Sequence, residues 1–179
     1  MNNKRRLGKT DIIVSEIGLG GFQLGEKIII NNEANATFGG MSEKDAIELV
    51  NKAVELGINS FDTAGVYGMG SSEYRLGKAL KEIRKDVKIF TKAGNTFSNP
   101  TQRDISYHHL MASINRSLKR LQTNYVDLFQ VHVPPKTEKE FSDVEKTFNE
   151  IRSEQKAKYF GISVGIRYEE GLEVIRRGI

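Results

Sequence analysis

Four strand-like segments of the sequence end in a polar residue, and turn or loop residues follow each of them at once. The four polar residues are Asp62, Lys92, His132 and Ser163. They stand 30, 40 and 31 residues apart, which leaves room for a helix to return the chain between parallel strands. In a parallel barrel the strand ends and the loops after them meet at one rim. The spacing therefore predicts an α/β fold in which these side chains gather at the carboxyl end of a parallel sheet.

Helix-like and strand-like runs alternate after the first 40 residues. In the first helical run Ser42 and Asp45 form a capping-box start, and apolar residues recur at helical spacing until Gly57. We expect helices over residues 43–56, 71–83, 106–121, 141–156 and 169–177, and strands over residues 14–21, 58–62, 87–92, 125–132 and 159–163. Turn-rich residues 4–12 predict an N-terminal β-hairpin, and polar residues 31–40 predict a mobile surface insertion.

Length and composition exclude several classes of protein. The 179 residues show no linker, which indicates one domain (residues 1–179), shorter than the roughly 200 residues of a complete (β/α)8 barrel. The chain has no cysteine, and its His, Asp and Glu residues lack metal-ligand spacing, so we expect no disulfide and no metal site. The longest aliphatic run, Ile28–Ile30, is too short to cross a membrane, and no secretory pattern begins the chain, which favours the cytoplasm. The net charge of +4 is spread along the chain, which argues against a nucleic-acid partner.

Several segments carry a more specific pattern. Residues 62–73 read DTAGVYGMGSSE, and residues 76–80 read LGKAL. The others are RLGKTDIIVSEIGLGGFQLG (6–25), IFTK (89–92), VDLFQVH (126–132) and KYFGIS (158–163). In this order along the chain, they resemble the motifs of the aldo-keto reductase superfamily. The resemblance implies part of a (β/α)8 TIM barrel, with about five βα units after the N-terminal β-hairpin.

The resemblance also implies NADPH-dependent reduction of a small aldehyde or ketone to an alcohol. The catalytic residues of the family correspond to Asp62, Tyr67, Lys92 and His132. Tyr67 would be the general acid, and because a free tyrosine has a pKa of about 10, we expect the Lys92 ammonium to lower that pKa. Asp62 would pair with Lys92 and hold it charged. His132 would donate a hydrogen bond to the substrate oxygen.

For the NADPH cofactor, the resemblance implies contacts from Ser163 and Gly21. The family often has an asparagine after this serine, whereas Val164 stands here, so the contact with the nicotinamide carboxamide would be half retained. Later strands of the family supply a glutamine and an aromatic residue at the nicotinamide and basic residues at the adenosine phosphate. We therefore expect a C-terminally truncated chain that lacks most of the cofactor-binding half, which leaves open whether it is an enzyme on its own.

Other interpretations stay open. Taken singly, Asp62 could cap a helix and Lys92 could be a solvated strand end. Tyr67 could serve packing, and His132 could be a loop histidine. The chain could be the N-terminal part of an active reductase, a non-catalytic partial barrel, or a regulatory or channel-associated member of the family. An open five-stranded sheet would expose two strand edges, so we expect the chain to self-associate or to belong to a longer polypeptide.

Overall fold

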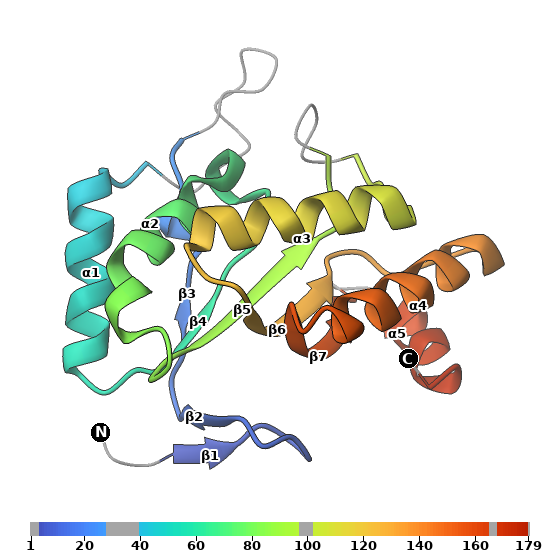
Figure 1. Ribbon diagram of the computed structural model, residues 1–179, viewed down its shortest axis with the longest axis horizontal. Helices are drawn as coiled ribbons and strands as arrows, with labels where there is room; N and C mark the ends of the chain where they lie inside the picture. The colour runs from blue at the N-terminus through green and yellow to red at the C-terminus, as the bar shows by residue number, and fades with distance from the viewer. Residues whose placement is uncertain (1–3, 28–39, 97–101, 165–167, 179) are drawn as a thin grey trace.

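The computed structural model describes residues 4–27, 40–96, 102–164 and 168–178. Its centre is a sheet of five parallel strands, β3 (Leu19–Gly20), β4 (Ser60–Asp62), β5 (Lys88–Ala93), β6 (Val126–Val131) and β7 (Ala157–Ile162). The α-helices are α1 (Glu43–Glu55), α2 (Ser71–Leu80), α3 (Tyr107–Leu121), α4 (Glu138–Ser153) and α5 (Tyr168–Arg176). The strands lie side by side in chain order, as Figure 1 shows, which confirms the predicted series of βα units.

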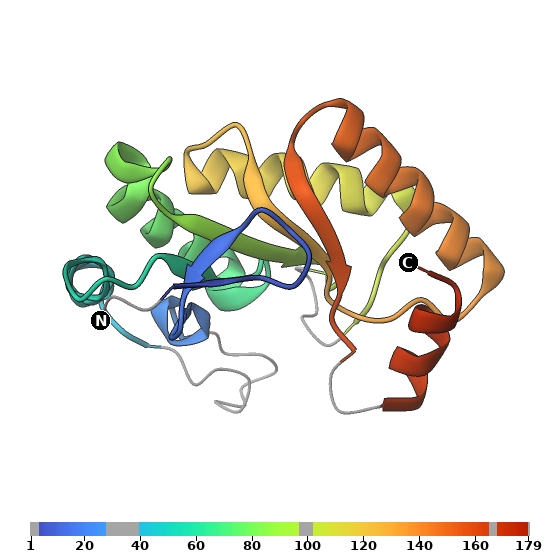
Figure 2. The ribbon, with the colours of Figure 1, turned by 90° about the horizontal axis from the view of Figure 1, so that it is seen from below.

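The helices pack their apolar stripes against the sheet. On α3 the stripe consists of Leu110, Ile114, Leu118 and Leu121, which are all buried. These side chains join one core with buried strand residues such as Ile89 and Phe129. Figure 2 shows the sheet curving beside its helices, with the N-terminal hairpin near the strands. The helical periodicity in the sequence therefore located the faces that the core buries.

Capping decides where two of the helices begin. The Ser42 hydroxyl accepts a hydrogen bond from the Asp45 N–H at 3.1 Å, as the sequence predicts for the start of α1. Helix α4 begins at Glu138, three residues before the predicted start at residue 141. The reason is a capping box in which the Thr137 hydroxyl accepts from the Glu140 N–H, and the Glu140 carboxylate accepts from the Thr137 N–H.

The predicted single strand over residues 14–21 is wrong, because the chain bends within it. Residues 13–15 form β2, which pairs with β1 (Lys4–Arg6) in an antiparallel hairpin, whereas only Leu19 and Gly20 join the parallel sheet. The Ser15 hydroxyl donates to the Ile17 carbonyl at 2.7 Å and closes the bend between them. The predicted N-terminal β-hairpin is present.

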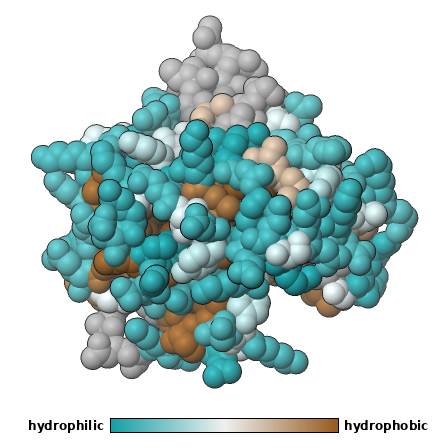
Figure 3. Space-filling model, in the orientation of Figure 1, coloured by the Kyte–Doolittle hydropathy of each residue, from teal (hydrophilic) through white to brown (hydrophobic). Residues whose placement is uncertain are grey.

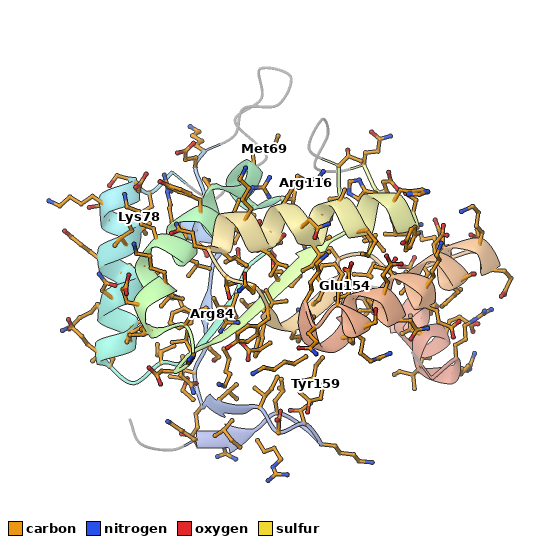
Figure 4. The ribbon with its side chains drawn as sticks, in the orientation of Figure 1. Met69, Lys78, Arg84, Arg116, Glu154 and Tyr159 are labelled. Atoms are coloured by element: carbon orange, nitrogen blue, oxygen red, sulfur yellow. The ribbon has the colours of Figure 1, made fainter. Side chains whose placement is uncertain are left out.

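This hairpin is tied to two strands of the sheet near their amino ends. The Asn59 side chain, just before β4, accepts from the Ser15 N–H at 2.7 Å. At the β7 edge of the sheet, the Tyr159 hydroxyl accepts a hydrogen bond from the Asp11 N–H at 3.1 Å. Figure 4 shows Tyr159 pointing toward the hairpin, whereas Met69 lies at the opposite end of the molecule. The hairpin therefore marks the amino end of the sheet and leaves the carboxyl end to the candidate site.

The face seen in Figure 3 is mostly hydrophilic, with a hydrophobic patch near the hairpin, where Ile13 is 39% exposed. Within the described residues, no helix has the length and apolar character to cross a membrane. The mobile insertion predicted over residues 31–40 lies outside the described residues except for Gly40.

Candidate active site

The carboxyl ends of three neighbouring strands bring the predicted catalytic residues together. Asp62 ends β4, Lys92 is the second-last residue of β5, and His132 follows β6. Tyr67 begins the short 3-10 turn η3 (Tyr67–Gly70), which comes soon after β4. The Lys92 ammonium donates to the Asp62 carboxylate and, at 3.0 Å, to the Thr63 carbonyl. All four predicted residues therefore meet at one edge of the sheet.

Two ring contacts complete the cluster. The rings of Tyr67 and His132 meet edge to face, with centroids 5.7 Å apart and planes at 74°. The Lys92 nitrogen lies 5.4 Å from the centroid of the Tyr67 ring. On its other side, Tyr67 contacts the Phe22 ring at 5.0 Å. These contacts orient the tyrosine toward both the lysine and the histidine.

The turn that presents Tyr67 depends on its glycines. Gly68, Met69 and Gly70 all have positive φ angles, of 56°, 54° and 92°. A Cβ atom on Gly68 would lie 2.4 Å from the Glu26 N and 2.6 Å from the Gly25 Cα. Glycine is the residue that adopts this backbone without strain and leaves that space free. The glycines of the motif thus allow the turn to pack closely against residues 25 and 26, and this packing holds Tyr67 in place.

The structural alternatives for Asp62 and Lys92 do not fit. The Lys92 side chain is 9% exposed, so it is no solvated strand end. Asp62 bonds this lysine, and it lies eight residues before Gly70, the cap of α2. The Asp62 side chain remains 44% exposed. The carboxylate compensates the buried ammonium and holds it at the site.

The pKa of Tyr67 moves in the direction opposite to the sequence prediction. Burial raises this pKa above its ordinary value, and the negative charge of Asp62 raises it further. The predicted lowering by Lys92 is wrong, because the ammonium is already paired with Asp62, whose carboxylate also acts on the tyrosine. Tyr67 is therefore a protonated phenol near neutral pH, and it can donate a proton.

His132 is neutral at the same pH. Burial first, and the positive charge of Lys92 second, lower its pKa to about 4, although Asp62 opposes the shift. Its Nδ1 atom is buried and has no hydrogen-bond partner among the described residues. A neutral imidazole carries one N–H donor and one acceptor nitrogen. The ring can thus offer a hydrogen bond to a ligand without adding a charge to the site.

The two residues predicted to contact a cofactor lie at the same edge of the sheet. The Ser163 N–H donates to the Val131 carbonyl at 2.8 Å, which places Ser163 beside the end of β6. The Gly21 N–H donates to the Asp62 carbonyl at 2.6 Å. A Cβ on Gly21 would lie 2.9 Å from the Ser72 hydroxyl, so packing alone accounts for this glycine. Their cofactor contacts stay predictions.

Behind the four residues lies a buried polar cluster for which we predicted no function from the sequence. It consists of Thr63, Ser72, Glu73, Thr91 and Arg120. The sequence pointed to part of this cluster, because Ser72 and Glu73 belong to the motif over residues 62–73. Their partners on β5 and α3 could not be read from it. In the part of the chain that the structure describes, no group of three or more acidic or histidine side chains could hold a metal ion.

Comparison with known proteins identifies relatives of this arrangement. The family model described as "Aldo/keto reductase family" matches residues 16–175. The chain is 33% identical over 163 residues to the uncharacterized oxidoreductase YqkF of Bacillus subtilis, covering 89% of this chain and 48% of that protein. It is 34% identical over 173 residues to a putative voltage-gated potassium channel subunit beta of Schizosaccharomyces pombe, covering 92% of this chain and 46% of that protein.

Solved structures agree with the sequence relatives. The holo form of aldo-keto reductase AKR11C1 from Bacillus halodurans superposes with a TM-score of 0.81 at 34% identity, covering 97% of this chain and 54% of that chain. The five-stranded parallel sheet and its helices thus match part of the TIM barrel of such reductases, as predicted. The chain spans about half the length of the curated relatives that it matches.

Proposed function

The chain belongs to the aldo/keto reductase family, and from this membership we propose that it acts in the NADPH-dependent reduction of small aldehydes or ketones to alcohols. The family generally uses NAD(P)H, and bound NADPH would supply the hydride. The observation that carries the proposal is the meeting of a protonated Tyr67 with a neutral His132 beside the buried Lys92–Asp62 pair. We also propose a cytoplasmic location.

In this proposal Tyr67 is the proton donor. Its raised pKa keeps the hydroxyl protonated until the carbonyl oxygen gains negative charge, and the proton then moves from the Tyr67 oxygen to that oxygen. The Lys92 ammonium stays paired with Asp62 beside the tyrosine ring, so the phenolate that remains faces this ion pair. His132 donates its ring N–H to the carbonyl oxygen, which orients the substrate and stabilises the developing charge. Asp62 holds the lysine in place through their ion pair.

For the nicotinamide we propose contacts from two residues at this edge. Ser163 stands next to the end of β6, where His132 lies, and it would hold the carboxamide of the ring. The Gly21 N–H bonds the Asp62 carbonyl at the same edge, and its proposed contact with the cofactor would come from its backbone, because Ser72 fills the space beside its Cα.

The experiment that tests this proposal is a pair of measurements on the purified chain. Titration with NADPH, followed by its fluorescence, reports binding, and loss of NADPH absorbance with a panel of small aldehydes and ketones reports turnover. Tyr67→Phe should abolish turnover and leave NADPH binding largely unchanged, because it removes only the hydroxyl. Retained turnover in this variant would refute the role of Tyr67.

One matched variant separates lost chemistry from a damaged fold. Tyr159→Phe also removes a tyrosine hydroxyl, but at the amino end of the sheet, where it bonds Asp11. It should leave both NADPH binding and turnover unchanged. A loss of turnover equal to that of Tyr67→Phe would mean that turnover depends on general stability rather than on the proton donor.

A second candidate function is a regulatory, channel-associated subunit without turnover. The 34% identity to a putative voltage-gated potassium channel subunit beta favours this candidate. The same measurements distinguish the two, since absence of turnover with every carbonyl compound would support the non-catalytic function. Absence of NADPH binding as well would favour a partial barrel without cofactor.

A further inference from the structure

Glu73 is a completely buried carboxylate in the first turn of α2, and two groups donate hydrogen bonds to it. The Thr91 hydroxyl donates to its Oε1 at 2.6 Å, and the Arg120 guanidinium donates to its Oε2 at 3.0 Å. A buried carboxylate without such partners would be costly. Glu73 therefore connects three elements, because it lies on α2, Thr91 on β5 and Arg120 on α3.

The contact of Glu73 with β5 is made by Thr91, the residue directly before Lys92 of the site. Thr91 and Lys92 are neighbours on this strand, and successive side chains of a strand point to opposite faces. On one face Lys92 bonds Asp62, and on the other face Thr91 bonds Glu73. The carboxyl end of β5 is thus held between two carboxylates, of which only Asp62 is exposed to the site.

The turn that carries Tyr67 rests on the same ion pair. A Cβ on Gly70 would lie 2.4 Å from the Arg120 Nε, so the turn lies directly against the guanidinium. Earlier in the loop, the Gly65 N–H donates to the Lys92 carbonyl at 3.0 Å. The position of a Cβ on Gly65 lies 3.8 Å from both the Glu73 Oε2 and the Arg120 Nη1. The loop between Asp62 and Tyr67 therefore packs on the Glu73–Arg120 pair.

We propose that Glu73 is a positioning residue of the active site, which acts through Thr91 and Arg120 to hold the Tyr67 turn against the end of β5. Its complete burial excludes contact with a substrate, so it acts on the chemistry only through these neighbours. The inference rests on the proposed roles of Tyr67 and Lys92, but the arrangement that it explains can be measured without cofactor or turnover.

The test uses Glu73→Gln, which keeps the shape of the side chain and removes its charge. The readout is NMR titration of the His132 ring, which contacts Tyr67 edge to face and senses the charge of Lys92. The chain has three histidines, so the His132 signals are assigned by their loss in His132→Gln. In the folded Glu73→Gln chain, we expect the ring signals of His132 to shift as Tyr67 moves. We also expect the His132 pKa to rise from about 4 toward its ordinary 6.5, because burial is the main cause of its lowering and a displaced Tyr67 turn would bury the ring less.

Asp127→Asn is the matched control. Asp127 is also a completely buried carboxylate paired with an arginine, since the Arg84 guanidinium donates to it at 2.9 Å. It lies near the amino end of β6, and Figure 4 shows Arg84 far from Met69 of the Tyr67 turn. This variant should lower the stability of the fold and leave the His132 titration unchanged. An equal shift in both variants would overturn the proposal, because general loosening would then explain it.

Thr91→Val gives a milder perturbation, which serves if Glu73→Gln does not fold. Valine has nearly the same shape and removes one of the two contacts of Glu73, so the His132 signals should shift in the same direction by a smaller amount. Unchanged His132 signals in a folded Glu73→Gln or Thr91→Val chain would refute the proposal.

Turnover provides an independent second readout. If the unaltered chain reduces carbonyl compounds, Glu73→Gln should lower kcat by up to about 100-fold, since a small misplacement of catalytic groups has an effect of that order. The KM for NADPH should change little. If the unaltered chain shows no turnover, the proposed function fails, whereas the His132 titration still decides whether Glu73 positions the Tyr67 turn.

Discussion

His132 should make this fold less stable in acid. Its pKa in the folded chain is about 4, whereas in the unfolded chain it returns to about 6.5. Between these two values the unfolded chain binds a proton that the folded chain does not bind. The free energy of unfolding therefore increases with pH in this window. The stability contributed by the neutral ring is complete above about pH 6.5 and is lost as the pH falls to about 4.

The size of this effect follows from the shift of the pKa. A difference of roughly 2.5 pKa units at about 1.4 kcal/mol per unit corresponds to about 3.5 kcal/mol, of which most is lost by pH 4. Domains of ordinary stability unfold with about 5–15 kcal/mol, so this one ring would account for a substantial part of the total. The physical cause is burial of the imidazole, with the Lys92 ammonium as the second contribution.

The assay is urea unfolding at a series of pH values between 7 and 4, for the unaltered chain and for His132→Gln. Other groups titrate in both proteins, so their contributions cancel in the difference between the two free energies of unfolding. We expect this difference to change by about 3 kcal/mol across the series, with the unaltered chain losing more stability. A difference that is independent of pH would refute the reasoning, because His132 would then have the same pKa in both states.

Three further predictions concern the fold. Ile114→Ala, in the completely buried stripe of α3, should lower the free energy of unfolding by about 2–5 kcal/mol in urea titrations, whereas Ile175→Ala, 73% exposed, should change it little. Gly70→Ala should lower the melting temperature, because its φ of 92° and the Arg120 side chain 2.4 Å from the new Cβ both oppose a side chain. The isolated chain should self-associate through the edges of β3 and β7, which no other strand of the described residues covers, and light scattering that shows a stable monomer of 20.1 kDa would contradict this.

Local patterns predicted most of the fold because they report directly on burial. The apolar stripe of α3 and the capping residue Ser42 each depend only on residues within the same helix or directly before it. The first strand was predicted wrongly because its division depends on partners elsewhere. Ser15 is held by Asn59, 44 residues away, while Leu19 pairs with Phe61 of the sheet. A strand-like run in the sequence does not show that its two halves have different partners.

For the candidate site, the sequence by itself determined which residue types are present and in what order, and the spacing of Asp62, Lys92 and His132 was enough to place them at one edge of a sheet. Only the tertiary structure decided their protonation. The pKa of Tyr67 is raised rather than lowered, because burial and the Asp62 charge act on it while Lys92 is paired. Burial and charge–charge distance arise between segments far apart in the chain, and for the same reason only the structure revealed Glu73 as the link between α2, β5 and α3.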